Sequence, residues 1–82
     1  MMVEFTPYAN TKFEILARHR FSVTEAEVQE VLLQPEGVDE TRAPLLVAHK
    51  RVDPGHALKV VYRGEKRAAK VITFYPVFYG RE

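Results

Sequence analysis

The spacing of apolar side chains changes once along this chain, and that change limits what it can fold into. Apolar residues recur with a helical period up to about residue 34 and alternate from about residue 45 onward, with the polar, turn-rich segment PEGVDETRAP between them. A chain of 82 residues can bury only one small core. Two helices followed by strands therefore predict a single α+β domain over residues 1–82.

Capping signals mark both predicted helices. The pair Thr6-Pro7 is typical of a helix start. In the segment SVTE, Ser22 and Glu25 fit a capping box, in which the two residues satisfy each other's backbone donors. Pro35 then ends the second helix near residue 34.

Alternation predicts antiparallel strands over residues 45–51, 57–63 and 68–75, separated by the turn DPG and the hairpin loop GEKR. A short edge strand around 38–41 would make a fourth, and Pro76 ends the last strand. Both helices and the sheet must bury an apolar face, so we expect both N-terminal helices to pack on one face of this three- or four-stranded antiparallel sheet.

Alternation also assigns the two faces of the predicted sheet. The expected core face carries Leu58, Val60, Tyr62, Ile72 and Phe74. The expected uncovered face carries Lys59, Val61, Arg63, Val71, Thr73 and Tyr75. Nothing later in the chain is long enough to cover the second face fully, so it is predicted to be a shallow, basic and partly aromatic surface.

Charge divides at the same place as the folding pattern. Residues 1–41 hold three basic and eight acidic side chains, a net charge of −5, whereas residues 42–82 hold nine basic and three acidic ones, a net charge of +6. Such asymmetry between halves favours a polyanionic partner for the basic half. Because the basic half is also the β-rich half, the uncovered sheet face is the predicted contact surface.

Composition excludes several other classes of site. The chain has no cysteine, which removes disulfides and thiolate sites, and its three histidines are scattered, which argues against a metal site. The first residues lack the pattern of a signal peptide, and no apolar run approaches the roughly 18 residues of a membrane span. We expect no metal, no cofactor and no membrane association, and a cytoplasmic protein.

Four segments, taken in order, carry a family resemblance: FTPYANTKF, FSVTEAEVQEVLLQPE, LKVVYR and VITFYP. They resemble the DUF4258 family, a BrnT-related branch of the RelE/ParE-like toxin superfamily. The resemblance implies a RelE-like fold and a small toxin-type protein that cleaves RNA, including mRNA, without a metal. It also implies a cognate antitoxin protein. Tyr8 stands where relatives carry the histidine of an early TPHA motif, and Arg81 stands near their terminal arginine-tyrosine pair.

Metal-independent RNA cleavage requires a group that takes the 2′-hydroxyl proton, one that protonates the leaving oxygen, and cations that hold the phosphate. The catalytic candidates are Tyr8, His49, Arg63, Tyr75 and Arg81. The RNA-binding candidates are Lys50, Arg51, Lys59, Arg63 and Lys66. Tyr75 and Tyr79 are also suited to stack on bases.

Two other interpretations remain open at the level of the sequence. Since Tyr8 replaces the histidine of relatives, the chain is alternatively a non-catalytic RNA- or protein-binding module of the same fold. A purely protein-binding role through an exposed edge strand is a third hypothesis. For each single cation, the simplest interpretation is an ordinary solvated charge on an open sheet.

Overall fold

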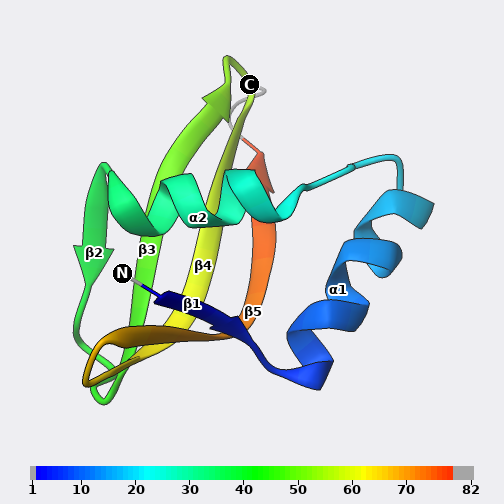
Figure 1. Cartoon of the computed structure of the whole chain (residues 1–82). Coiled ribbons are helices and arrows are strands. Elements are labelled where there is room, and N and C mark those ends of the chain that lie inside the picture. The colour runs from blue at the N-terminus through cyan, green and yellow to red at the C-terminus, as the bar shows by residue number, and fades with distance from the viewer. Residues whose placement is uncertain (1, 79–82) are drawn as a thin grey trace.

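The computed structural model describes residues 2–78, which form a five-stranded mixed sheet with two helices (Figure 1). In chain order the elements are β1 (Met2–Phe5), α1 (Pro7–Arg18), α2 (Glu25–Leu33), β2 (Gly37–Asp39), β3 (Leu45–Asp53), β4 (His56–Glu65) and β5 (Ala68–Phe78). The strand order is β1-β5-β4-β3-β2. The predicted α+β class is confirmed.

The predicted strand count and the purely antiparallel sheet are wrong. The chain enters the fold through β1 and not through a helix, and β1 pairs in parallel with β5, placing Met2 opposite Ala68 and Phe5 opposite Val71. The other strand pairs are antiparallel. Four residues are too few to show alternation, and their partner strand lies at the far end of the chain, so the local pattern carried no signal for this pairing.

The predicted cap of α1 is confirmed, whereas that of α2 is shifted by two residues. The Thr6 Oγ1 accepts a hydrogen bond from the Ala9 N–H at 3.1 Å. In α2 the cap is Thr24 and not Ser22, because Thr24 Oγ1 accepts from the Glu27 N–H at 3.1 Å and Glu27 Oε1 accepts from the Thr24 N–H at 2.9 Å. The capping box is present, but both of its partners lie two positions later than predicted.

The core lies between the two helices and one face of the sheet. The helices contribute Ala9, Leu16, Val28, Val31 and Leu32, and the strands contribute Ala48, Leu58, Val60, Ala69, Val71 and Phe74. Phe13 of α1 packs against Phe74 with ring centroids 4.7 Å apart. Leu58, Val60 and Phe74 therefore face the core, as predicted from alternation.

A β-bulge in β5 reverses the prediction for two neighbouring residues. Val61 lies opposite Thr73 and Tyr62 opposite Val71, which leaves Ile72 as the extra residue of β5. As a result Val71 is fully buried in the core, although it was assigned to the uncovered face, and Ile72 is only half-buried, although it was assigned to the core. A bulge inserts one residue and shifts the alternation beyond it.

The strands of the hairpins are longer than predicted. The strand β3 reaches Asp53, and the turn after β4 contains only Lys66 and Arg67. Pro76 does not end β5, which continues to Phe78. Because β1 pairs with β5 only as far as Val71, the outer edge of β5 has no described strand neighbour at Pro76, and an edge strand tolerates proline.

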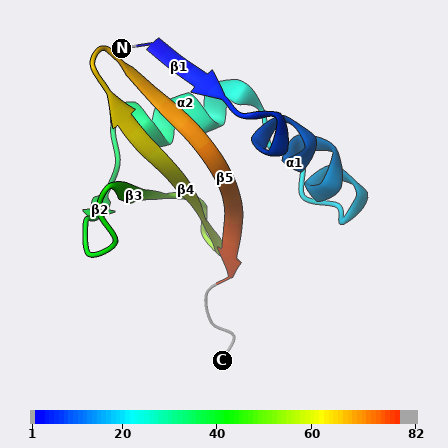
Figure 2. The same cartoon turned by 90° about the horizontal axis from the view of Figure 1, so that it is seen from below.

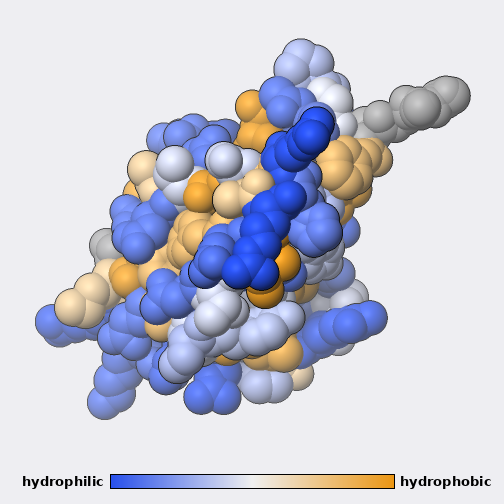
Figure 3. Space-filling model, turned by 90° about the vertical axis from the view of Figure 1, so that its right-hand side faces the viewer, coloured by the Kyte–Doolittle hydropathy of each residue, from blue (hydrophilic) through white to orange (hydrophobic). Residues whose placement is uncertain are grey.

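Both helices lie on the same side of the sheet, and no helix among the described residues covers the other side (Figure 2). We call this other side the open face. The surface on the α1 side of the molecule is mainly hydrophilic, with apolar patches between the polar side chains (Figure 3).

Replacing Val60 with aspartate is expected to unfold the domain. Val60 is 0% exposed, and an unpaired buried charge costs several kcal/mol against a total stability of about 5–15 kcal/mol. The control is Val61→Asp on the open face, which should remain folded with a loss of about 1 kcal/mol or less. Thermal unfolding followed by circular dichroism distinguishes them, and a cooperatively folded Val60→Asp protein would contradict this assignment of faces.

Candidate nucleic-acid interface

The open face is built from four cross-strand rows of side chains. The row nearest the β3–β4 turn holds Arg51, Ala57 and Val77, and the other three rows form the candidate interface. Of these three, the first row holds Gly37, His49, Lys59 and Tyr75. The second holds Asp39, Val47, Val61 and Thr73, and the third holds Leu45, Arg63 and Lys70. Neighbouring strands lie about 4.8 Å apart, so residues within one row are direct neighbours. Val47 and Val61 of the second row thus form an apolar centre between the polar side chains of the first and third rows.

The imidazole of His49 lies over Gly37 of the neighbouring strand β2. A Cβ added at Gly37 would stand 2.6 Å from His49 Cε1 and 3.1 Å from Nε2. Only glycine leaves room for the ring in this position. The ring of His49 therefore leans toward β2, while Lys59 and Tyr75 continue the row on the other side of β3.

A shallow groove of about 250 Å³ crosses the middle of the open face. Its lining residues are Asp39, Arg42, Leu45, Val47, Lys59, Val61 and Tyr75. The apolar members belong to β3 and β4, Asp39 lies at the β2 end, and Tyr75 lies at the β5 end with 37% of its surface exposed. The groove thus combines an apolar floor, an aromatic side chain, a carboxylate and two cations.

The carboxylate of Asp39 is fixed by the turn that follows β2. Its Oδ1 accepts hydrogen bonds from the Thr41 N–H at 2.9 Å and from the Thr41 hydroxyl at 2.8 Å. These bonds, the backbone one first, lower the pKa of Asp39, and the positive charges of Arg42 and Lys59 act in the same direction. Asp39 is therefore a fixed, ionised acceptor at neutral pH.

A cation from α1 reaches the β5 edge of the open face. The Lys12 Nζ donates to the Thr73 Oγ1 at 3.3 Å, and Thr73 belongs to the second row. Tyr8 precedes Lys12 by about one helical turn, so the two side chains project from the same side of α1. Tyr8 is 58% exposed and lies outside the three rows.

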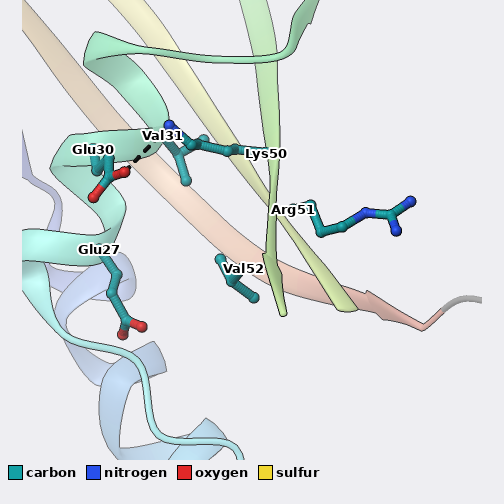
Figure 4. Close-up of a pocket in the computed structure, with 6 residues that line it drawn as sticks. All are labelled: Glu27, Glu30, Val31, Lys50, Arg51 and Val52. Carbon is teal, nitrogen blue, oxygen red and sulfur yellow. Dashed lines mark ion pairs between the residues drawn. The ribbon is translucent and has the colours of Figure 1, made fainter. Parts of the chain in front are cut away.

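The predicted cationic run at 49–51 is divided between the two sides of the sheet (Figure 4). Lys50 points toward α2, where its Nζ lies 3.2 Å from Glu30 Oε2. Arg51 points the other way, as alternation requires. Between α2 and β3 this leaves a hollow of about 130 Å³ whose lining includes Glu27, Glu30 and Lys50. Lys50 is thus an ion-pair partner of a helix and does not lie on the open face.

The remaining predicted site residues are distributed as follows. Arg63 lies on the open face, two rows away from Lys59, with its Nη2 3.6 Å from Glu65 Oε2. Lys66 lies in the β4–β5 turn at the end of the sheet. Arg81 and Tyr79 lie outside the described residues. The structure therefore brings together His49, Lys59 and Tyr75 in one row, with Arg51 in the adjacent row and Arg63 two rows away on the other side.

Sequence reasoning missed four polar residues of this surface: Lys12, Asp39, Arg42 and Lys70. The bulge at Ile72 brings Lys70 to the open face, opposite Arg63. Asp39 and Arg42 belong to the polar segment between the helical and the alternating parts of the chain, where charged residues are ordinary. Lys12 belongs to the first helix, where a lysine is ordinarily a solvated surface residue. No local signal shows that these side chains converge on the sheet, because their positions depend on how the turn and α1 pack against β3 and β5.

A histidine-carboxylate pair lies at the β3–β4 turn, on the helix side of the sheet. The His56 Nδ1 lies 2.6 Å from Asp53 Oδ1, which also accepts the Gly55 N–H at 2.8 Å. The bond to His56 is the main cause that lowers the pKa of Asp53. The His56 ring packs 4.7 Å from Phe78 and 5.3 Å from Phe21, so the pair joins this turn to the connection between the helices.

Within residues 2–78, no three histidine, aspartate or glutamate side chains are grouped closely enough to hold a metal ion. Neither described helix has the length and apolar character needed to cross a bilayer. Comparison with known proteins found no family model, no curated protein and no solved structure that matches this chain.

Proposed function

We propose that this protein binds single-stranded RNA on the open face of its sheet. The observation that carries the proposal is the row in which His49, Lys59 and Tyr75 lie side by side on a surface that no described helix covers. A cation beside an aromatic ring is the combination that binds a phosphate and stacks on the adjacent base.

The positive charges of the open face favour a polyanionic ligand. Lys59, Arg63 and Lys70 come from adjacent strands, and Lys12 adds an ammonium at the β5 edge. Arg42 adds a guanidinium at the groove. The apolar centre of the face is small and lies in a groove, which suits an unstacked strand with exposed bases better than a folded protein partner.

The resemblance to the RelE/ParE-like toxins extends this proposal. It favours RNA over DNA, mRNA as the physiological RNA, and the cytoplasm as the place of action. It also adds a cognate antitoxin that blocks the open face. The non-catalytic RNA-binding module of the same fold differs from this proposal only in lacking cleavage.

Binding of a labelled single-stranded RNA, measured by fluorescence anisotropy at several salt concentrations, tests the proposal. The affinity should fall as salt rises, with a log–log slope of roughly −0.7 for each phosphate contact. Lys59→Gln should reduce the magnitude of that slope by about 0.7 and weaken binding of all sequences to a similar degree. Lys50→Gln is the matched control on the other side of the sheet and should bind as the parent does.

Salt-insensitive binding, or an equal effect of Lys59→Gln and Lys50→Gln, would contradict the open face as the RNA site. Purified protein that binds no RNA but captures an extended peptide would favour the edge-strand hypothesis instead.

Cleavage is the second candidate activity, and it rests on the position of His49 and Tyr75 on either side of Lys59. His49 would take the 2′-hydroxyl proton, and the O2′ would attack the phosphorus while Lys59 holds the phosphate. As the P–O5′ bond breaks, the leaving O5′ would take a proton from the Tyr75 hydroxyl. The products are a 2′,3′-cyclic phosphate and a 5′-hydroxyl end, and the steps need no metal.

The space over Gly37 provides a sharp test of this chemistry. His49→Gln should abolish cleavage of an end-labelled RNA in the presence of a chelator. Gly37→Ala should lower the rate because the new methyl group displaces the imidazole, whereas Gly64→Ala should not, since a Cβ there meets nothing within 4 Å. RNA binding that persists without any cleavage by the parent would identify the non-catalytic module.

A further inference from the structure

Asp39 is an acidic residue in a groove that is proposed to bind RNA, and contacts with phosphate alone do not explain it. Asp39 carries a negative charge at the edge of the groove, close enough to Arg42 and Lys59 for their charges to lower its pKa. A carboxylate repels phosphate oxygens, and an ionised carboxylate only accepts hydrogen bonds. The part of an RNA that lies against Asp39 must therefore present N–H or O–H donors.

The geometry of Asp39 leaves one oxygen available for such a donor. Both hydrogen bonds from Thr41 go to Oδ1, and among the described residues no donor reaches Oδ2. Thr41 holds the carboxylate in place before any ligand arrives, which reduces the entropy lost on binding. A fixed acceptor at the end of an apolar floor is the usual arrangement for orienting a flat ligand.

The floor and the opposite end of the groove suit a base. Val47 and Val61 form apolar surface between Asp39 and Tyr75, and all four residues line the same groove. The strands β2 and β5 are three inter-strand spacings apart, roughly 14–15 Å, part of which the side chains of Asp39 and Tyr75 fill. The remaining length and the volume of about 250 Å³ accommodate one unstacked nucleobase.

We infer that this groove selects guanine in single-stranded RNA and that Asp39 is the residue that reads it; the inference rests on the proposed RNA-binding function. Guanine is the base whose Watson–Crick edge places two N–H donors side by side, at N1 and N2, and the two lone pairs of the free Oδ2 can accept both. Adenine and cytosine place a ring acceptor beside their amino group, which would oppose the carboxylate. Uracil offers a single N–H. Arg42 and Lys59 lie beside the groove, where they can contact the flanking phosphates.

Competition binding with short oligoadenylates that carry one central guanosine, inosine, adenosine or uridine tests the inference. The guanosine oligonucleotide should bind about tenfold more tightly than the all-adenosine one, as expected when a charged acceptor meets matching donors. Inosine, which keeps the N1–H and lacks the N2 amino group, should fall between them. Each oligonucleotide should show the same salt slope, because the number of phosphate contacts does not change.

Asp39→Asn is the matched variant, since the amide oxygen can still accept the Thr41 N–H and keep the turn. It should bind the adenosine oligonucleotide at least as tightly as the parent does and lose the preference for guanosine. Salt-dependent binding with equal affinity for all four oligonucleotides would overturn the base selectivity and leave the proposed function standing. A guanosine preference that survives in Asp39→Asn would overturn the role of Asp39, and no binding of any oligonucleotide would overturn both proposals.

Discussion

The two helices of the described chain cover only one face of the sheet, and the rest of the structure depends on that constraint. Two short helices supply the apolar side chains that bury Leu58, Val60, Val71 and Phe74. A domain of this size has a total stability of about 5–15 kcal/mol, so it cannot spare further residues for a second apolar layer. The opposite face must therefore be compatible with water. Its rows of cations, half-buried valines and one tyrosine are the consequence, and they form the only large uninterrupted surface of the described sheet that no helix covers.

Much of the fold could be predicted because its elements are locally encoded. Thr6 caps α1 where the sequence indicates, and alternation correctly placed Leu58 and Val60 in the core. The failures share one physical cause, which is dependence on distant partners. The strand β1 exists because it pairs with β5, more than 60 residues away in the sequence, and Ile72 forms a bulge although Val71 and Ile72 are equally apolar. At the start of α2, two hydroxyl residues each precede a glutamate by three positions, so the local sequence fits both, and Thr24 is the cap in the structure.

The candidate site, like the fold, could be predicted where it depends on local alternation and not where it depends on distant segments. Alternation identified Lys59, Arg63 and Tyr75 as residues of one uncovered face, and the register of β3 with β4 adds His49 to the row of Lys59. It did not identify Asp39, Arg42 or Lys12, because a turn and a helix bring them to the sheet from segments without alternation. The net positive charge of residues 42–82 overstates the number of cations available on the open face. Lys50 pairs with Glu30 on the helix side, and Arg63 lies near Glu65. The surface is a mixed one, with cations around an apolar centre, and the proposed recognition of a base beside a phosphate rests on this mixture.

The most direct test of the open face as the RNA site is a search for contacts between RNA protons and valine methyl groups by isotope-filtered NMR. Val47 and Val61 lie on the open face, whereas Val28 and Val60 lie in the core beneath the helices. With a bound single-stranded RNA, intermolecular nuclear Overhauser effects should connect base protons to the methyl groups of Val47 and Val61 and to the ring of Tyr75. Effects confined to residues of α1, α2 or the β4–β5 turn, with none at Val47 and Val61, would contradict the account.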